Sequence, residues 1–234
     1  MACDFTPPLA RGRSDREAER VGIMQFQVPP HDCPLCPRLV AFRKTNRQTH
    51  PDFFNDPVPS FGSLEAKLLI VGLAPGLKGA NHTGRPFTGD YAGGLLYGSL
   101  ARHGLTRGTY SARVDDGFEL AGVRISNAVR CVPPENKPLP SEINTCRPFL
   151  TAEIAAMKDL RTILALGKVA HDSVATALKL KKKDHVFKHG ARHEAEGLVI
   201  FASYHCSRYN TNTGVLTEAM FNRVVAAAKK AAGL

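Results

Sequence analysis

The sequence has no apolar segment that approaches the roughly 20 residues needed to cross a membrane. Its first residues, Met1 to Asp15, mix Asp, Arg and Pro and lack the apolar stretch of a secretory signal. These absences argue against membrane and secreted proteins and indicate a cytoplasmic one. Disulfides are uncommon in a reducing compartment, so the six cysteines are candidates for metal binding, burial in the core or catalysis.

Acidic residues are also in the minority. The chain has 31 Lys and Arg against 21 Asp and Glu, which gives a net charge of +10. A basic surface attracts polyanions such as nucleic acid, although many basic proteins never contact DNA. Charge alone therefore leaves open whether the partner is a nucleic acid.

The chain has the length and composition of one large folded domain. Hydrophobic residues make up 43% of its 234 residues, enough to fill a core. Residues 1–30 lack periodicity, apart from a short helix expected over 15–21, and we expect them to form a peripheral N-terminal arm. Residues 31–234 are then expected to form a single domain, in which we find no internal repeat.

Strand and helix patterns alternate from residue 68 onward. Short apolar runs bounded by turn residues predict buried strands, and apolar positions at helical spacing predict helices. The expected strands are 68–72, 123–129, 162–166 and 198–202, and the expected helices are 91–103, 141–157, 168–180 and 215–232. This order predicts a three-layer α/β/α sandwich with a central, mainly parallel sheet. The functional loops of such a fold lie beyond the carboxyl ends of the strands, at 73–90, 127–140 and 203–214.

Four of the cysteines form two pairs. Cys33 and Cys36 make a CxxC motif, and fourteen residues separate Cys131 from Cys146. If the two segments pack together, the four thiolates can hold a metal. Structural zinc sites usually draw on two tight pairs, so the wide second pair favours an iron-sulfur cluster over zinc. Buried core thiols and a redox CxxC stay open as alternatives.

The first functional loop, 73–90, is rich in glycine but is neither of the common phosphate loops. Its glycines do not fit GxGxxG, and GxxxxGK[ST] occurs nowhere in the chain. Together with the segments Ser126-Asn127-Ala-Val-Arg-Cys131 and Ser203-Tyr-His205-Cys-Ser-Arg, this loop resembles the uracil-DNA glycosylase superfamily. The match is nearest to family 5, the B-type enzymes. It runs from about residue 33 to 214 and includes the order of the four cysteines.

Individual positions distinguish family 5 from family 4, the sister group with the same cluster. Family 4 enzymes carry an acid directly after the first glycine of the loop, where this chain has Leu73. The segment Thr88-Gly89-Asp90 also matches the B-type pattern. One position departs from it, because the third loop usually reads His-Pro-Ser and Cys206 here takes the place of the proline.

The resemblance implies a DNA-repair enzyme that hydrolyses the N-glycosidic bond of uracil and so starts base-excision repair. Hypoxanthine and ethenocytosine are further expected substrates. The implied cofactor is a 4Fe-4S cluster, and its implied ligands are Cys33, Cys36, Cys131 and Cys146. The implied partner is DNA containing uracil or other deaminated bases. We expect a monomer that stays in the cytoplasm with the chromosomal DNA and binds no membrane.

Such an enzyme must rotate the target nucleotide out of the duplex, stack its base and read the base edge. Phe87 is the candidate stacking platform, and Asn127 is the candidate for reading a pyrimidine edge. Gly72, Leu73 and Ala74 complete the expected base-binding set. Without the resemblance, Phe87 fits an apolar anchor for the loop and Asn127 fits a turn asparagine bonded to its own backbone.

Cleavage of the glycosidic bond builds positive charge on the sugar and negative charge on the departing base. We expect His205 to donate to the base carbonyl and Asp90 to orient the attacking water and stabilise the sugar cation. Without the resemblance, His205 is an ordinary loop histidine and Asp90 a helix N-cap. The expected DNA contacts follow His205 in the third loop: Ser207, Arg208, Tyr209 and Asn210.

Two other function classes fit parts of the sequence. His205 beside Cys206 resembles the activated pair of a thiol hydrolase, although adjacent residues on an extended segment often point in different directions. A non-catalytic module with a metal-stapled fold would bind damaged and undamaged DNA alike and release no base. An iron-sulfur electron carrier is disfavoured, because the chain has no flavin or nicotinamide motif.

Overall fold

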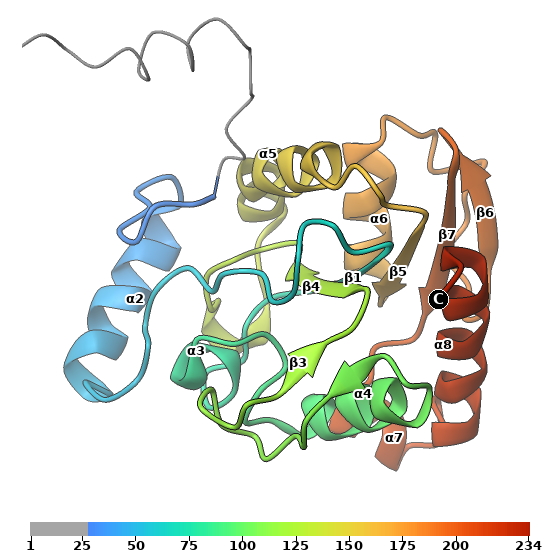
Figure 1. Cartoon of the computed structure of the whole chain (residues 1–234). Coiled ribbons are helices and arrows are strands. Elements are labelled where there is room, and N and C mark those ends of the chain that lie inside the picture. The colour runs from blue at the N-terminus through green and yellow to red at the C-terminus, as the bar shows by residue number, and fades with distance from the viewer. Residues whose placement is uncertain (1–27) are drawn as a thin grey trace, which may run out of the picture.

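A computed structural model describes residues 28–234 (Figure 1). Most of the expected N-terminal arm, with the helix expected over 15–21, therefore lies outside the described residues. A five-stranded sheet in the order β4-β1-β5-β7-β6 forms the centre. No helix among the described residues is both long and apolar enough to span a membrane.

The sheet is mainly parallel, as the sequence predicts. Its parallel strands are β4 (Val123–Asn127), β1 (Leu68–Gly72), β5 (Thr162–Leu166) and β7 (Leu198–Ser203). Every residue of β1, β4 and β5 is buried, which explains why β1 and β5 read as short apolar runs. The polar Arg124 and Ser126 of β4 are buried because both donate to Glu153. The sequence did not predict β6 (Arg192–Ala195), an antiparallel edge strand whose residues are half-buried or exposed in alternation.

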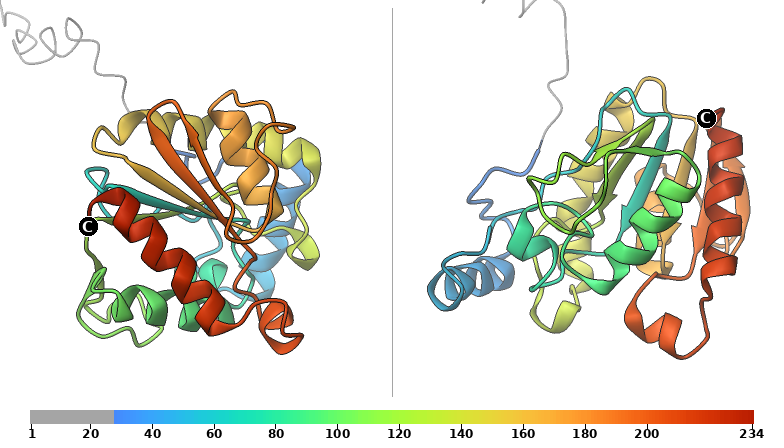
Figure 2. Two further views of the ribbon diagram at one scale, coloured as in Figure 1. Left: turned by 90° about the vertical axis from the view of Figure 1, so that its right-hand side faces the viewer. Right: turned by 60° about the horizontal axis from the view of Figure 1, so that its bottom comes forward.

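Helices cover both faces of the sheet, as the two views of Figure 2 show. Leu68 and Ile70 of β1 pack on one face with α4 (Tyr91–Arg102) and α8 (Glu218–Ala232). Leu69 and Val71 pack on the other face with α5 (Pro140–Ala156) and α6 (Lys168–Ala177). The alternation of side chains along a strand produces these two cores, and the predicted α/β fold is confirmed.

Several boundaries and short elements differ from the predictions. α6 ends three residues earlier than expected, and α8 begins three residues later, after Thr217, whose Oγ1 accepts from the Met220 N–H at 3.2 Å. β4 ends at Asn127 instead of 129. Short helices interrupt all three functional loops. They are α3 (Ala80–Thr83), the 3-10 helix η1 (Pro134–Asn136) and α7 (Arg208–Asn212).

The helix α2 (Pro37–Thr49) was not predicted at all. Its buried side chains are Leu39, Arg43 and Asn46, so its inner face is largely polar and gives no apolar periodicity. Proline at its first position, after Cys36 as N-cap, is a favourable helix start. A small two-stranded sheet, β2 (Thr106–Arg107) with β3 (Glu119–Leu120), completes the fold.

Candidate active site

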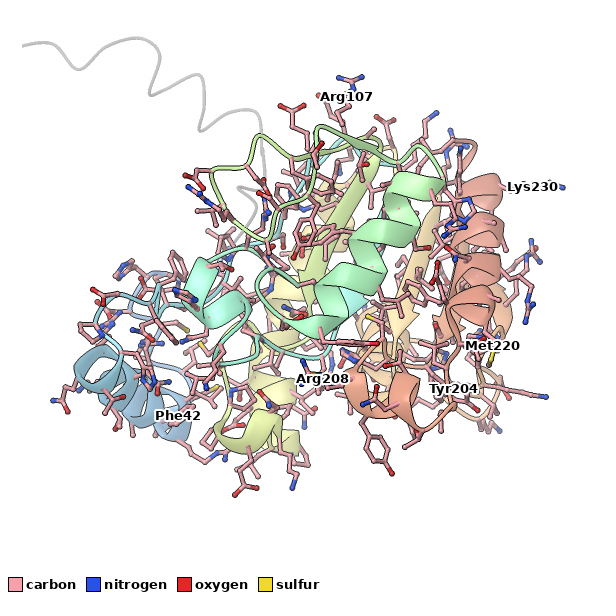
Figure 3. All side chains as sticks on the ribbon, turned by 90° about the horizontal axis from the view of Figure 1, so that it is seen from below. Phe42, Arg107, Tyr204, Arg208, Met220 and Lys230 are labelled. Atoms are coloured by element: carbon pink, nitrogen blue, oxygen red, sulfur yellow. The ribbon has the colours of Figure 1, made fainter. Side chains whose placement is uncertain are left out.

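The carboxyl ends of the parallel strands bring the three functional loops together at one edge of the sheet. Gly72 at the end of β1 lies in register with Asn127 at the end of β4. A cavity of about 690 Å³ opens there, and it is lined from the first loop by Leu73, Ala74 and Asp90, from the second by Asn136, and from the third by His205, Ser207 and Arg208. Figure 3 views the molecule from the side on which Arg208 and Tyr204 lie.

The expected stacking platform lies against the other base-binding residues. Phe87 is 6% exposed, and its ring stacks on that of His205 with centroids 6.0 Å apart and planes 28° apart. A Cβ added at Gly72 would lie 2.6 Å from the Phe87 ring and would overlap Oδ1 of Asn127. Glycine at position 72 therefore permits the close approach of Phe87 and Asn127 to the end of β1.

Asn127 is buried with an unused acceptor. Its residue exposure is 3%, and none of the residues that the structure describes donates to its Oδ1. A buried acceptor without a donor is costly in a folded protein and calls for an explanation. The turn interpretation, in which the amide bonds its own backbone, does not account for this oxygen, whereas a ligand with an N–H donor does.

The two carboxylate oxygens of Asp90 have different surroundings. Oδ1 accepts from the Gly93 N–H at 3.0 Å and caps α4. Oδ2 lies beside Gly79 and Gly76, where an added Cβ would be 2.6 and 3.5 Å away, at the wall of the cavity. One oxygen is thus fixed by the helix while the other is available to a ligand.

Burial lowers the pKa of His205, and the nearby Asp90 carboxylate opposes this shift only in part. The imidazole is therefore neutral at physiological pH and carries one N–H that can donate. The backbone carbonyl of His205 accepts from Nδ2 of Asn210 at 2.8 Å. Asn210, an expected DNA contact, thus holds the His205 loop in place.

The other expected DNA contacts surround the mouth of the cavity on α7. Ser207 caps this helix and accepts from the Asn210 N–H at 3.4 Å. The Arg208 guanidinium lies over the ring of Tyr91, 5.3 Å from its centroid. Tyr209 is 74% exposed, so its ring is accessible to a partner.

Cys206 does not fit a thiol hydrolase. It is 0% exposed and packs in the core beneath α4 and α8, and burial raises the pKa of its thiol far above the usual range. A nucleophilic cysteine needs access and a lowered pKa, so this alternative is wrong. Cys206 is a buried apolar side chain at the position that proline usually occupies.

The four paired cysteines line one common cavity between α2, the end of β4 and α5. Burial, followed by repulsion among the neighbouring thiolates and Glu142, raises the pKa of Cys36 to about 11. Burial also raises the pKa of Cys131 to about 12, although Arg43 opposes the shift. Buried thiols of this kind become thiolates when a bound cation compensates their charge.

The surroundings of these sulfurs are those of a candidate metal site. Among the described residues, His31, Asp32 and Asp56 form a group of metal-binding side chains whose ligand atoms all lie within 4.8 Å of one another. The four cysteine sulfurs, which also lie in the described part of the chain, do not form such a group. The sulfurs also accept N–H donors, from Arg130 N to Cys146 at 3.4 Å and from Arg43 Nη1 to Cys131 at 3.7 Å.

Sequence reasoning missed Asn136, which lines the same cavity as Asp90 and His205. Glu135 and Asn136 both have left-handed backbone conformations, with φ of 54° and 56°. Such conformations cost energy and often cluster at functional sites. The segment lay in a loop that the strand order had marked, and the run of prolines around it was the signal for an irregular turn.

Comparisons with known proteins show the family to which the chain belongs. The profile of the Uracil DNA glycosylase superfamily matches residues 59–229. A type-5 uracil-DNA glycosylase from Thermus thermophilus is 44% identical over 209 residues, which cover 86% of this chain and 94% of the relative. One from Pyrobaculum aerophilum is 39% identical over 206 residues, 86% of this chain and 90% of the relative. A type-4 enzyme from that organism matches less of the chain, with 35% identity over 140 residues, 59% of this chain and 57% of the relative.

Proposed function

The chain belongs to the uracil DNA glycosylase superfamily, and we propose on this basis that it is a type-5 uracil-DNA glycosylase that starts base-excision repair. The observation that carries the proposal is the buried Oδ1 of Asn127, to which no described residue donates. Uracil presents a ring N–H beside a carbonyl, the complement of a side-chain amide. A flipped uracil stacked on Phe87 would satisfy this acceptor.

Asp90 and His205 divide the charge that develops as the glycosidic bond breaks. Oδ2 of Asp90 stabilises the cationic sugar and orients the water that attacks it, while Oδ1 stays bonded to Gly93 and fixes the carboxylate. The neutral His205 ring donates to the base carbonyl as negative charge grows there. Because the ring is neutral before the reaction, it donates without first having to bind a proton.

The proposed DNA contacts around the cavity are Ser207, Arg208 and Tyr209. The net charge of +10 favours the approach to a polyanion, and Arg208 supplies a cation at the cavity wall. The exposed ring of Tyr209 is suited to fill the space that the flipped base leaves in the duplex. Asn210 acts indirectly, through the carbonyl of His205.

We further propose that Cys33, Cys36, Cys131 and Cys146 hold a 4Fe-4S cluster. This assignment is supported by four sulfurs around one cavity, by the wide separation of Cys131 and Cys146 in the sequence, and by the N–H groups that face two of the sulfurs. A bound cluster would contribute folding free energy by joining α2 to β4 and α5. Arg130 and Arg43 would balance part of the negative charge of the thiolates.

The proposed substrates extend beyond uracil to hypoxanthine and ethenocytosine. Leu73 lines the cavity at the position where family 4 enzymes carry an acid. An acid at this position would reject any base that left the carboxylate without a partner, and Leu73 has no such charge. Discrimination against purines should therefore be weak. The volume of about 690 Å³ leaves room for a two-ring base.

Release of free base from synthetic duplexes tests the proposed function. The protein is incubated with duplexes that carry uracil, hypoxanthine or ethenocytosine, and the released bases are separated and measured. Release of uracil supports the enzyme. Tight binding of damaged and undamaged duplexes alike, without release of any base, would support the non-catalytic binding module.

A further inference from the structure

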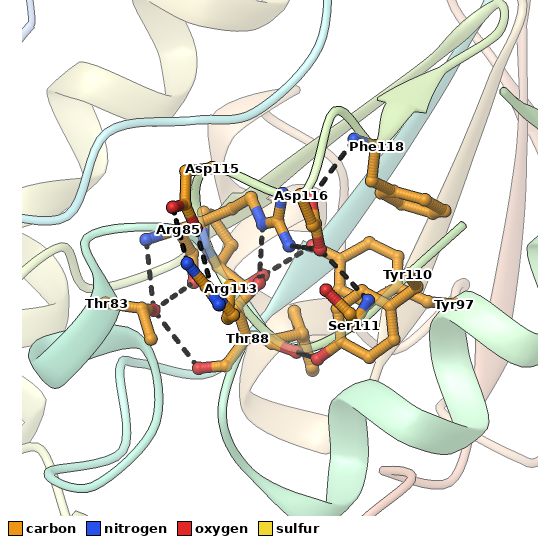
Figure 4. Close-up of polar contacts among 12 residues, drawn as sticks. Thr83, Arg85, Thr88, Tyr97, Tyr110, Ser111, Arg113, Asp115, Asp116 and Phe118 are labelled. Carbon is orange, nitrogen blue, oxygen red and sulfur yellow. Dashed lines mark hydrogen bonds and ion pairs between the residues drawn. The ribbon is translucent and has the colours of Figure 1, made fainter. Parts of the chain in front are cut away.

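A buried polar cluster contacts the loop that carries Phe87, and the proposed reaction gives this cluster no role (Figure 4). Its centre is Arg85, which is 6% exposed. Nη1 and Nη2 of Arg85 donate to the two carboxylate oxygens of Asp116 at 2.8 Å each, and Nε donates to Oγ1 of Thr88 at 2.8 Å. The side chain of Asp116 is 1% exposed, so the ion pair is shielded from water.

Four aromatic rings surround the Arg85 guanidinium, with their centroids 5.2 to 6.0 Å from its central carbon. They belong to Phe61, Tyr97, Tyr110 and Phe118. Asp116 also accepts from the backbone N–H groups of Ser111 and Phe118, both at 3.1 Å. A buried ion pair stabilises little by itself, but one with this many bonds fixes the relative position of the two segments that it joins.

Two of the surrounding rings hold the backbone of the platform. The Tyr97 hydroxyl donates to the Pro86 carbonyl at 2.5 Å, and the Tyr110 hydroxyl donates to the Phe87 carbonyl at 3.2 Å. Gly93 of α4 lies so close that an added Cβ would overlap the Phe87 carbonyl oxygen. With the bond from Arg85 to Thr88, the three consecutive residues 86–88 are each fixed by a partner from outside this tripeptide.

Phe87 has a left-handed backbone conformation, with φ of 53°. This conformation is costly for a bulky residue and persists only where the surroundings determine it. It directs the ring toward Gly72 and the His205 imidazole. The hydrogen bonds at 86–88 are therefore the contacts that keep the platform at the end of β1.

We propose that Tyr97 and Tyr110, which pack around the Arg85–Asp116 ion pair, are positioning residues for base release. They act through Phe87, by holding its ring at a fixed distance from His205 and Asn127. The inference rests on the proposed function, because it concerns the rate of the same reaction. A misplacement of about 1 Å at a reacting site can slow the chemical step by roughly 10²-fold. A cluster that serves only stability would leave the rate of folded, DNA-bound protein unchanged.

The test removes the two hydroxyl groups and keeps the rings and the ion pair. The variant Tyr97→Phe/Tyr110→Phe is compared with the parent and with Ser99→Ala. Ser99 lies on α4 like Tyr97, and its hydroxyl donates to Asn222 at 2.7 Å, away from the platform. The control thus also loses a hydroxyl hydrogen bond of α4. Release of uracil is followed in single turnovers with saturating protein, and affinity is measured on a duplex with a 2′-fluorinated deoxyuridine, whose glycosidic bond resists cleavage.

We expect the double variant to slow single-turnover release about tenfold or more, with its DNA affinity and the rate of Ser99→Ala within about twofold of the parent. Should the double variant not fold, Tyr110→Phe alone takes its place, because Tyr110 is only half-buried. A rate equal to that of Ser99→Ala, or a loss that follows the folded fraction or the affinity, overturns the positioning role. A folded parent that releases no base refutes the proposed function itself, and the positioning role with it.

Discussion

Replacement of Asp90 by asparagine separates the helix-capping role, which the structure shows, from the proposed catalytic role. In the parent, the Gly93 N–H donates to Oδ1 of Asp90 at 3.0 Å. The amide oxygen of asparagine can accept the same hydrogen bond. Asparagine and aspartate cap helices about equally well, so the free energy of unfolding should change by less than about 0.5 kcal/mol. The second oxygen, which lies beside Gly79 at the cavity wall, becomes an uncharged amide nitrogen. The change thus removes the carboxylate from the site and leaves the helix start intact.

The chemical step should respond strongly to this change. If the carboxylate stabilises the sugar cation and orients water, single-turnover release of uracil should fall by roughly 10²-fold, equivalent to about 2.7 kcal/mol of transition-state stabilisation. Single-turnover kinetics isolate this step from slow product release. Asp90→Ala serves as the control, because it removes the cap as well and should destabilise the protein by about 1 kcal/mol.

A near-parental rate for Asp90→Asn would refute this reasoning. It would leave Asp90 as a helix cap and place the chemistry on His205 and backbone groups. Reduced DNA affinity with an unchanged chemical step would also count against the catalytic role, because it would show that the carboxylate acts in binding.

Four further predictions follow from the same geometry. Purified protein should be brown and contain about four irons per chain, and Cys33→Ala should lose iron and fold poorly whereas Cys3→Ala should not; colourless protein with one zinc would contradict the cluster. The parent should release hypoxanthine as well as uracil, and Leu73→Glu should lose more hypoxanthine than uracil activity; strict uracil specificity of the parent would refute the open-pocket argument. Affinity for duplex DNA should fall steeply with salt, and Arg208→Ala should reduce the slope of log affinity against log salt by about one; an unchanged slope would place Arg208 away from phosphates. The pKa of His205 is lowered in the folded protein, so as the pH falls the unfolded chain binds a proton before the folded protein does. The contribution of His205 to stability is therefore complete above the unfolded pKa of about 6.5 and is lost as the pH falls toward the folded pKa. His205→Asn should reduce this pH dependence in thermal unfolding, and an unchanged dependence would assign it to other groups.

Much of the fold and of the site could be predicted because it depends on local patterns. Buried parallel strands read as short apolar runs, and the order of strands and helices determines which loops share an edge of the sheet. Positions such as Phe87, Asn127, Asp90 and His205 follow these strands or lie in these loops, and the structure brings them together. The cysteine spacing indicated one metal site, and the four thiols do line one cavity.

Tertiary contacts decided what local patterns could not. The buried face of α2 contains Arg43 and Asn46, so no apolar period marked this helix. Cys206 beside His205 could be a nucleophile until packing against α4 and α8 buried it. Asp116 lies 31 residues beyond Arg85, and only the fold pairs them.

The chain by itself thus determined the class of fold, the order of the functional loops and the residue types available in them. Only the tertiary structure decided which oxygen of Asp90 is bound and which is free, why Asn127 has an unsatisfied acceptor and how Phe87 is held. The physical reason is that periodicity and turn chemistry act over a few residues along the chain. Burial, charge pairing and the approach of backbone atoms depend instead on residues that are distant in sequence and meet only when the core is packed.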